Sequence, residues 1–272
     1  MPPSSVSENC ALSSSPETTA PRILALANQK GGVGKTTTAV NLAAALAARY
    51  RILLIDLDPQ GNASTGLGVD RATRRTGTYA MLVEGRPVAE VARPTRIPNL
   101  SVIPADPDLA GGELELVDLE GREHRLRRAL EGVNGYDWVI LDCPPSLGLL
   151  TLNALVAAHS VLVPLQAEFY ALEGVSQITQ TIERVRRALN PRLALEGIAL
   201  TMFDRRNNLS EAVENDVRQH FGAKVFDTII PRNVRVSEAP SHGLPVTIYD
   251  IRSPGAQAYV ALAAELLRRN RA

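Results

Sequence analysis

Residues 29–38 read Gln-Lys-Gly-Gly-Val-Gly-Lys-Thr-Thr-Thr, and the rest of the chain is arranged around them. An apolar run at 22–27 precedes this stretch, and an Ala/Leu-rich helical pattern at 38–48 follows it. Strand, glycine loop and helix in this order are the context in which a glycine motif cradles phosphate. Glycines let backbone N–H groups approach phosphate oxygens, and the helix that follows presents its positive end there. The stretch therefore predicts a P-loop, in which Lys35 reaches the terminal phosphates and the Thr36 hydroxyl binds Mg²⁺.

The composition is that of an ordinary globular protein. A length of 272 residues suits one large α/β domain or two small ones. The net charge is zero, so any DNA site must be a local basic patch. No apolar run approaches the roughly 20 residues that span a bilayer, and the N-terminus lacks the basic-then-apolar pattern of a signal peptide. Two cysteines, Cys10 and Cys143, make no disulfide framework. We expect a cytoplasmic protein.

The first 21 residues differ from the rest. They are rich in Ser, Pro and Thr and contain few large apolar side chains, so they cannot bury enough surface to order themselves. We expect residues 1–21 to form a flexible tail and residues 22–272 to form a single P-loop ATPase domain. An alternative role for the tail is to dock an activator.

From residue 22 onward, strand-like apolar runs alternate with helical patterns. The expected strands are 23–27, Ile52–Asp56, 100–104, Trp138–Asp142, 161–165, 195–201 and 225–229. The expected helices are 36–48, 122–130, 149–158, 172–189, 209–221 and Pro254–Arg269. Most of the strand candidates are continuous apolar runs, as in a sheet covered on both faces. The alternation predicts a doubly wound α/β fold, with a mostly parallel sheet and helices on both faces.

Two of these strands run into acidic motifs at their carboxyl ends, where ligands of such sheets bind. Ile52–Asp56 continues as Asp-Leu-Asp-Pro-Gln-Gly-Asn, and Trp138–Asp142 continues as Asp-Cys-Pro-Pro-Ser. Asp142 fits the Walker B carboxylate that holds Mg²⁺ through a water, because Mg²⁺ keeps most of its waters. Asp58 is the candidate for orienting the attacking water, since phosphoryl transfer depends on positioning and charge stabilisation. Alternatively, Asp56 and Asp58 merely cap a turn.

Two further segments carry weaker signals. The glycines Gly61, Gly66 and Gly68 suggest a mobile switch loop. Residues 77–96 are the least informative part of the domain and read as a surface helical insert.

The glycine loop departs from the usual P-loop, because Gln29 stands where that motif has glycine and a second lysine, Lys30, follows. Lys-Gly-Gly-x-Gly-Lys-Thr is the deviant Walker A motif, and the chain resembles the MinD/ParA group that carries it. Asp-Leu-Asp-Pro-Gln-Gly-Asn, Asp-Cys-Pro-Pro-Ser and Pro-Arg-Asn-Val-Arg are similar to the ParA/Soj chromosome- or plasmid-partition ATPases. The resemblance covers about 22–272. It implies catalytic roles for Lys30 and Lys35, with Lys30 crossing a dimer interface to the partner's nucleotide.

The resemblance also implies roles for single residues. In that family the aspartate matched by Asp58 orients the attacking water, and the one matched by Asp56 stands near the metal without ligating it directly. The Pro-Arg-Asn turn holds the adenine, with Pro231 packing on the base and Asn233 reading its edge. The nucleotide-binding residues that the resemblance implies are Lys30, Gly31, Gly32, Val33, Gly34, Lys35, Thr36, Thr37, Pro231 and Asn233. The implied cofactors are ATP and Mg²⁺.

The implied partners are non-specific DNA, a ParB/Spo0J-type centromere-binding protein and a second copy of the chain. Arg206 and Arg235 match positions that line a basic DNA-binding face on the dimer, and Arg232 is close by. Taken alone, any one of these arginines reads as a solvated surface charge. Contacts to phosphates would be independent of sequence and sensitive to salt. The resemblance thus implies a nucleoid-associated ATP-dependent switch, whose hydrolysis is weak until DNA and the partner stimulate it.

Three rival functions remain in view. An iron-protein reductase shares the deviant loop but needs paired cysteines at a dimer axis, and here Cys143 lies beside Asp142. A membrane-associated MinD-like cell-positioning ATPase would use the last helix as an amphipathic anchor. That helix is half alanine on its apolar face and has no Phe or Trp, so a packed terminal helix is favoured and no stable membrane association is expected. A non-catalytic binding module would not need the intact Lys35 and Asp58. Tyr170, in a segment that bridges protomers in the family, is equally compatible with a core aromatic.

Overall fold

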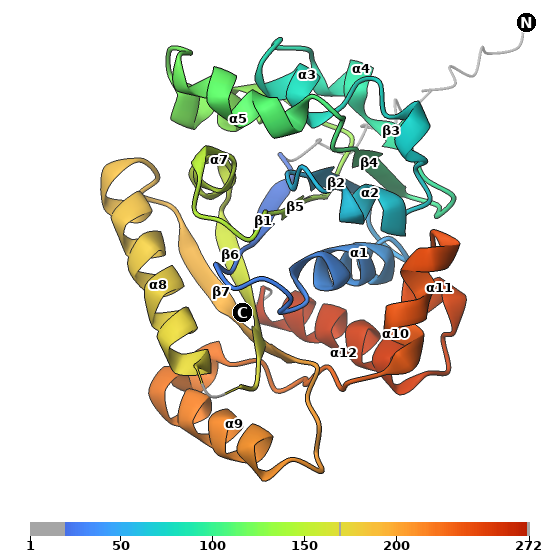
Figure 1. Cartoon of the computed structure of the whole chain (residues 1–272), viewed down its shortest axis with the longest axis vertical. Coiled ribbons are helices and arrows are strands. Elements are labelled where there is room, and N and C mark those ends of the chain that lie inside the picture. Colours follow the sequence, from blue (N-terminus) through green and yellow to red (C-terminus); the bar gives the residue numbers. More distant parts are fainter. Residues whose placement is uncertain (1–19, 169, 271–272) are drawn as a thin grey trace, which may run out of the picture.

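The computed structural model describes residues 20–168 and 170–270. Among these residues, seven strands form one sheet in the order β3-β4-β2-β5-β1-β6-β7, with helices on both of its faces (Figure 1). All neighbouring strands are parallel except β3, which runs antiparallel to β4. The predicted doubly wound α/β fold is confirmed. The predicted tail falls almost wholly on 1–19, outside the described residues, so the domain boundary stays a prediction.

Six of the seven predicted strands form, each within one residue of its predicted ends. The strands are β1 Arg22–Leu26, β2 Ile52–Asp56, β3 Arg93–Pro94, β4 Leu100–Ile103, β5 Trp138–Asp142, β6 Ser160–Gln166 and β7 Ala194–Thr201. The strand predicted at 225–229 is wrong, because this segment makes a single isolated bridge, from Val225 to Ile198 of β7. The carboxylate of Glu265 takes the backbone N–H groups of Asp227 and Thr228, at 2.8 and 2.9 Å, so they are not available for a ladder.

All six predicted helices form. The helices are α1 Lys35–Leu46, α2 Asn62–Gly66, α3 Thr78–Leu82, α4 Val88–Val91, α5 Leu109–Val117, α6 Arg125–Leu130, α7 Leu149–Ala157, α8 Ala171–Ala188, α9 Asn208–Phe221, α10 Val234–Glu238, α11 Val246–Tyr249 and α12 Pro254–Arg269. The predicted helix at 122–130 begins as a 3-10 turn, Arg122–His124, before α6. The segment predicted as a switch loop contains the helix α2. Most of the unpredicted helices have only four or five residues, too few to show a helical period.

The sheet separates two apolar cores. On β5, Val139 and Leu141 belong to the core on one side, and Trp138 and Ile140 belong to the core on the other. Every residue of β2 and β5 is buried, which explains why these strands read as continuous apolar runs. The segment 77–96 is not merely a surface insert, as predicted, because its helices α3 and α4 contribute buried residues to the first core.

The carboxyl ends of β1, β2 and β5 meet at one edge of the sheet. β5 lies between β1 and β2, and Asp56 at the end of β2 stands opposite Asp142 at the end of β5. The loop from β1 into α1 leaves from the same edge (Figure 1). The fold therefore gathers the predicted P-loop and both acidic motifs at one place, as expected for ligand sites of open α/β sheets.

Candidate functional site

The loop between β1 and α1 has the backbone geometry of a phosphate cradle. Gly32 and Gly34 have φ of +74° and +85°, a left-handed conformation that favours glycine. A Cβ placed on Gly31 or Gly32 would meet no protein atom within 4 Å, so one side of the loop is open. No side chain caps the N-terminus of α1, and its first N–H groups stay available for an anion. On the other side, the Thr201 hydroxyl donates to the Val33 carbonyl at 2.8 Å and anchors the loop to β7.

The ammonium of Lys35 is buried beneath this loop. The residue is 6% exposed, and its Nζ donates to the Lys30 carbonyl at 2.9 Å. Burial lowers the pKa of Lys35, against the opposing charge of Asp142. No carboxylate lies within ion-pair distance of it among the described residues, so a bound anion would compensate a buried positive charge.

Asp142 is the most conspicuous group at this edge. It is fully buried, and neither of its carboxylate oxygens has a hydrogen-bond partner. Burial, reinforced by the charge of Asp56, raises the pKa of Asp142 well above its ordinary value; Thr36 and Lys35 act in the opposite direction. Buried carboxylates normally pair or ligate a metal. A carboxylate with two orphaned oxygens near a Thr hydroxyl therefore fits a divalent cation that takes oxygen ligands.

Asp56 is engaged within the chain. It is fully buried and accepts from the Ser64 N–H at 2.8 Å, the Ser64 hydroxyl at 2.6 Å and the Asp58 N–H at 3.3 Å. Burial raises the pKa of Asp56 to about 6. These bonds leave Asp56 less free than Asp142 to ligate a metal directly. Sequence reasoning missed Ser64, which ties the end of β2 to α2.

Asp58 is buried at the same edge of the sheet, two residues beyond Asp56. It is 7% exposed, and its Oδ1 accepts from the Gln60 N–H at 3.0 Å. Its other oxygen has no partner among the residues that the structure describes. The side chain can therefore cap the turn and still accept a hydrogen bond from a water.

Lys30 has a partner that the sequence did not reveal. Its ammonium forms an ion pair with Glu168, which follows β6, and each side chain is 42% exposed. Within one chain the deviant lysine is thus held at the surface beside the P-loop. Tyr170, two residues beyond this acid, is 65% exposed, so the interpretation of Tyr170 as a core aromatic is wrong.

The Pro-Arg-Asn turn lies against the end of β7. Pro231 forms an isolated parallel bridge with Phe203, and the Arg232 N–H donates to the Phe203 carbonyl at 3.0 Å. The Oδ1 of Asn233 is buried without a hydrogen-bond partner, so it can accept from a ligand. Because β7 also anchors the P-loop through Thr201, this turn and the P-loop flank the same strand end.

The arginines lie on two adjoining segments but differ in their partners. A cavity of about 570 Å³ is lined by Arg205, Arg206 and Arg232 together with Pro231. The guanidinium of Arg206 binds both oxygens of Asp204, at 2.9 and 2.8 Å, and these bonds lower the pKa of Asp204 to about 2. Within the described chain, Arg205 and Arg232 have no ion pair.

Arg235 lies apart from that cavity, on α10. Its guanidinium pairs with Glu238 at 2.8 Å and with Asp250 at 3.5 Å. The sequence prediction overlooked these acids and Asp204, although Asp204 lies only two residues from Arg206.

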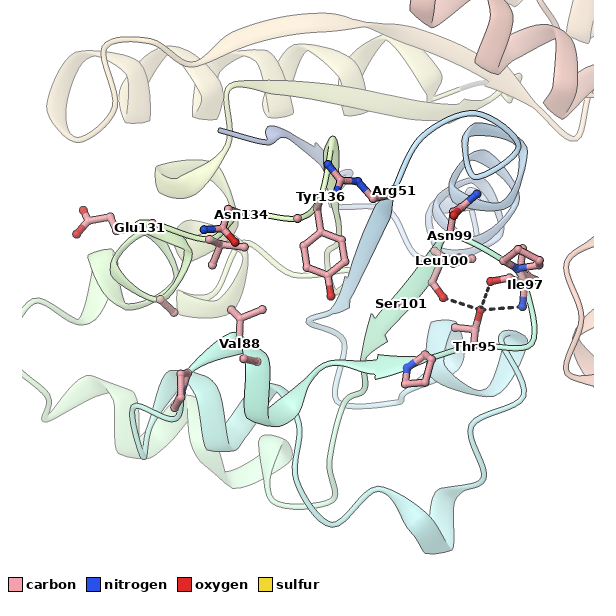
Figure 2. A pocket seen from close by; sticks show the side chains of 18 residues that line it. Arg51, Val88, Thr95, Ile97, Asn99, Leu100, Ser101, Glu131, Asn134 and Tyr136 are labelled. Carbon is pink, nitrogen blue, oxygen red and sulfur yellow. Dashed lines mark hydrogen bonds between the residues drawn. The ribbon is translucent and has the colours of Figure 1, made fainter. Parts of the chain in front are cut away.

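A second kind of cavity opens at the opposite edge of the sheet. It measures about 750 Å³, and its walls come from the segments before β2, β4 and β5 and from α4 (Figure 2). Val88, Leu100 and Tyr136 line it, and the Thr95 hydroxyl holds its loop by donating to the Leu100 carbonyl at 2.8 Å. None of the predicted site residues contributes to it.

The last helix and the cysteine bear on the rival functions. α12 packs on α1 through Tyr259, Leu262 and Leu266, all at most 1% exposed, so its apolar face is covered by the chain itself. No helix within the described ranges is long and apolar enough to cross a membrane. Cys143 is fully buried, and burial raises the pKa of its thiol. Cys10 lies outside the described residues. A surface Fe–S site built on Cys143 is therefore not supported.

Comparisons with known proteins add an independent finding. A family model described as an AAA domain matches residues 21–195. A chromosome partitioning protein ParA of Caulobacter vibrioides is 60% identical over 254 residues, which cover 92% of this chain and 95% of that protein. A sporulation initiation inhibitor protein Soj of Bacillus subtilis is 54% identical over 247 residues, covering 90% and 98%.

Solved structures agree with this pattern. A cobyrinic acid a,c-diamide synthase of Mycobacterium smegmatis, with bound ADP and magnesium, superposes with a TM-score of 0.81 at 40% identity and covers 93% of this chain and 96% of that one. The septum site-determining protein MinD of Pyrococcus horikoshii, complexed with Mg-ADP, has a TM-score of 0.75 at 24% identity, with 90% and 96% covered. The latter likeness shows the fold alone.

Proposed function

The chain belongs to the ParA/Soj family of chromosome-partitioning ATPases, and from this premise we propose that it is an ATP-driven DNA-binding switch. In the proposed cycle, two protomers close around Mg-ATP and the dimer binds DNA without sequence preference. Hydrolysis, stimulated by a ParB-type centromere-binding protein, then releases the DNA. The switch would associate with the nucleoid and drive segregation of a chromosome or plasmid.

The observation that carries the nucleotide site is the orphaned, fully buried carboxylate of Asp142 at the edge where the P-loop opens. Thr36 and Asp142 are the residues that would hold Mg²⁺, with Asp142 acting through a water and Asp56 standing behind. Bound there, Mg²⁺ neutralises charge on the β- and γ-phosphates. Lys35 and the loop N–H groups bind the phosphate oxygens, which compensates the buried ammonium.

Asp58 is proposed to position the attacking water. Its free carboxylate oxygen accepts a hydrogen bond from that water, while the bond from the Gln60 N–H to the other oxygen fixes the side chain. Such positioning is the main task left to the protein in phosphoryl transfer.

Recognition of the base is assigned to the Pro-Arg-Asn turn. Pro231 offers an apolar surface for the purine ring, and the buried Oδ1 of Asn233 accepts a hydrogen bond from its amino group. An orphaned acceptor with this role would reject a base that presents a carbonyl at the same position. Adenine is accordingly favoured over guanine.

The two proposed states of the switch are the separate protomer and the closed dimer. Lys30 leaves Glu168 and reaches the phosphates bound by the partner, where it meets more negative charge with ATP than with ADP. This difference makes the closed dimer dependent on ATP.

The DNA contact is proposed for Arg206, Arg232 and Arg235, through phosphates. Because Asp204 neutralises Arg206, the Asp204→Asn variant should bind DNA more tightly. Replacing Arg206 and Arg235 with Glu should abolish DNA binding while leaving the ATP-dependent dimer intact. If each arginine neutralises one phosphate, the log–log salt slope falls by roughly 0.9 for each arginine lost per protomer.

The decisive experiment is a DNA-binding titration with ATP, ADP or no nucleotide, repeated with the arginine variants and run in parallel with liposomes. Tight DNA binding confined to ATP supports the proposal. Equal affinity in the three nucleotide states would reject the switch, and retained affinity in the Glu variants would place the DNA face elsewhere. ATP-dependent binding to liposomes without DNA binding would favour the MinD-like alternative, which the buried face of α12 argues against.

A further inference from the structure

Another cavity, different from the one in Figure 2, lies at the edge of the sheet where the strands begin, across the molecule from the P-loop. It measures about 1020 Å³ and is formed by the first residues of β1, β6 and β7 with the ends of α9 and α12. We call it the amino-edge pocket. Its lining includes five cationic side chains, Arg22, Arg192, Arg218, Lys224 and Arg269. None of these residues belongs to the nucleotide site or the proposed DNA face.

Two buried polar atoms of this pocket have no partner. Ser160, the first residue of β6, is 3% exposed, and its hydroxyl makes no hydrogen bond. The Nε of Arg22 is also buried and unpartnered. Ser160 pairs in register with Leu24, so Arg22 and Ser160 lie on the same face of the sheet. Arg22 can only donate at this atom and the Ser160 hydroxyl can also donate, so the pair calls for an acceptor.

His159 adds a third donor. Its Nδ1 accepts the Ile23 N–H at 2.9 Å, so the neutral ring carries its proton on Nε2. Burial, together with the charges of Arg22 and Arg192, lowers the pKa of His159, which favours the neutral ring. Both arginines line the pocket together with His159. In the part of the chain that the structure describes, the Arg192 guanidinium has no hydrogen bond or ion pair.

The buried acid of the pocket is already engaged: Glu196 accepts from Asn270 at 2.8 Å and lies 3.6 Å from Arg22. The other acid, Asp227, is 89% exposed and lies 3.9 Å from Arg218.

Two cations are also satisfied. Arg218 pairs with Glu214 at 2.8 Å, and Arg269 pairs with Glu265 at 2.7 Å. Lys224 uses one of its three donors on the Leu195 carbonyl at 3.0 Å. Besides the two remaining donors of Lys224, the unsatisfied donors come from His159, Ser160, Arg22 and Arg192.

We propose that the amino-edge pocket binds a phosphate group, held by the Ser160 hydroxyl, the Arg22 Nε, the Arg192 guanidinium and the His159 Nε2. An oxyanion only accepts hydrogen bonds and can satisfy several donors at once, which matches this set. The Ser160 hydroxyl and the Arg22 Nε are buried, so side chains lining the pocket must move aside before an anion reaches them. The ligand is therefore small, a free phosphate or a terminal phosphate of a small molecule. An in-chain phosphodiester of duplex DNA carries a sugar on each side and would not reach that hydroxyl.

The test uses the full chain with Mg-ADP at saturation, which blocks phosphate binding at the P-loop. Inorganic phosphate is titrated while the imidazole resonances are followed by NMR, with the His159→Gln variant assigning the signal. A saturable shift of the His159 signal is expected. Ser160→Ala should weaken phosphate binding about tenfold or more, as expected for a lost hydrogen bond to a charged group. Arg192→Glu should abolish the shift, whereas Arg184→Glu, an equal charge change on exposed α8, should leave it unchanged.

Several outcomes overturn the proposal. These are a His159 signal that does not respond to phosphate, an Arg192→Glu variant that binds phosphate as well as the parent, and equal losses in the Arg184→Glu control. A second arm titrates a duplex with 5′-hydroxyl ends. A His159 shift with that duplex and none with phosphate would replace the small-molecule ligand by the DNA backbone. Because the reporter lies across the sheet from the P-loop, failure here leaves the proposed ATPase cycle untouched.

Discussion

The ion pair between Lys30 and Glu168 predicts that Glu168 restrains dimerisation. Both side chains are 42% exposed, so the pair is worth about 0.2–1 kcal/mol, the range of surface salt bridges. Two such pairs must break when two protomers exchange their lysines, which costs about 0.4–2 kcal/mol per dimer. Removing the acid in Glu168→Gln should therefore strengthen the ATP-bound dimer about 2- to 30-fold, since 1.4 kcal/mol corresponds to a factor of ten. Sedimentation equilibrium with Mg-ATP measures this, in an Asp58→Ala background that prevents turnover.

Two controls test whether the stronger dimer comes from breaking the ion pair between Lys30 and Glu168. Glu183→Gln removes the same charge from α8 and breaks an ion pair of similar exposure, with Arg186 at 2.6 Å, and it should leave the dimer unchanged. In a Lys30→Ala background the Glu168→Gln change should have no effect, because the pair is already gone. An equal or weaker dimer in the Glu168→Gln protein would show that Glu168 contributes to the closed state, and the reasoning would fail.

Three further predictions concern the buried charges. Lys35→Ala should lose ATP-dependent dimerisation, and light scattering that still shows the ATP dimer would contradict the assignment of the P-loop. Asp58→Ala should still bind ATP and DNA but release no phosphate; normal phosphate release would remove its proposed role. Asp142→Asn should lose Mg²⁺-dependent ATP binding. In the nucleotide-free chain at pH 8, the same change should raise the free energy of unfolding in urea by about 1–3 kcal/mol, because it removes an uncompensated buried charge. Since burial raises the pKa of Asp142 above 3.8, the folded parent loses stability as pH rises above that value, so the advantage of Asn should grow with pH and shrink towards pH 4.

The sheet could be predicted because its signal is local. Buried parallel strands appear in a sequence as continuous apolar runs. The predicted bounds of Ile52–Asp56 and Trp138–Asp142 agree with those of β2 and β5. The failed strand at 225–229 reads Val-Phe-Asp-Thr-Ile, and the N–H groups of its two polar residues, Asp227 and Thr228, are taken by Glu265, which lies 38 and 37 residues further along the chain. No local pattern could reveal that competition. One-turn helices such as α3 and α4 escape for a different reason, because four or five residues do not define a period.

The candidate site shows the same division. Motifs located the carboxylates and lysines, and the sheet brought their strand ends together. The partners were harder to predict: Glu168 lies 138 residues from Lys30 in the sequence, so only the fold reveals the pair. Asp204 could have been suspected, because an acid two residues from Arg206 is within reach of its guanidinium.

The segment after Asp58 shows how a change at the phosphates could reach the surface. It was predicted as a mobile loop, but the structure has the helix α2, whose Ser64 is bonded to Asp56 through both its backbone N–H and its hydroxyl. The buried guanidinium of Arg74 donates to the Gly61 carbonyl at 3.0 Å and to the Thr65 hydroxyl at 2.7 Å, which ties the start of α2 to its last turn.

These hydrogen bonds connect α2 to Asp56, which also accepts from the Asp58 N–H, so that the helix and both aspartates are held together. If nucleotide displaces Asp56, we expect Ser64 to move with it, and we expect the bonds of Arg74 to Gly61 and Thr65 to carry the displacement to the whole of α2. Packed elements of this kind change between discrete arrangements instead of deforming gradually. A switch that must distinguish ATP from ADP by one phosphate is better served by such a unit than by a flexible loop, because a flexible loop would absorb the displacement.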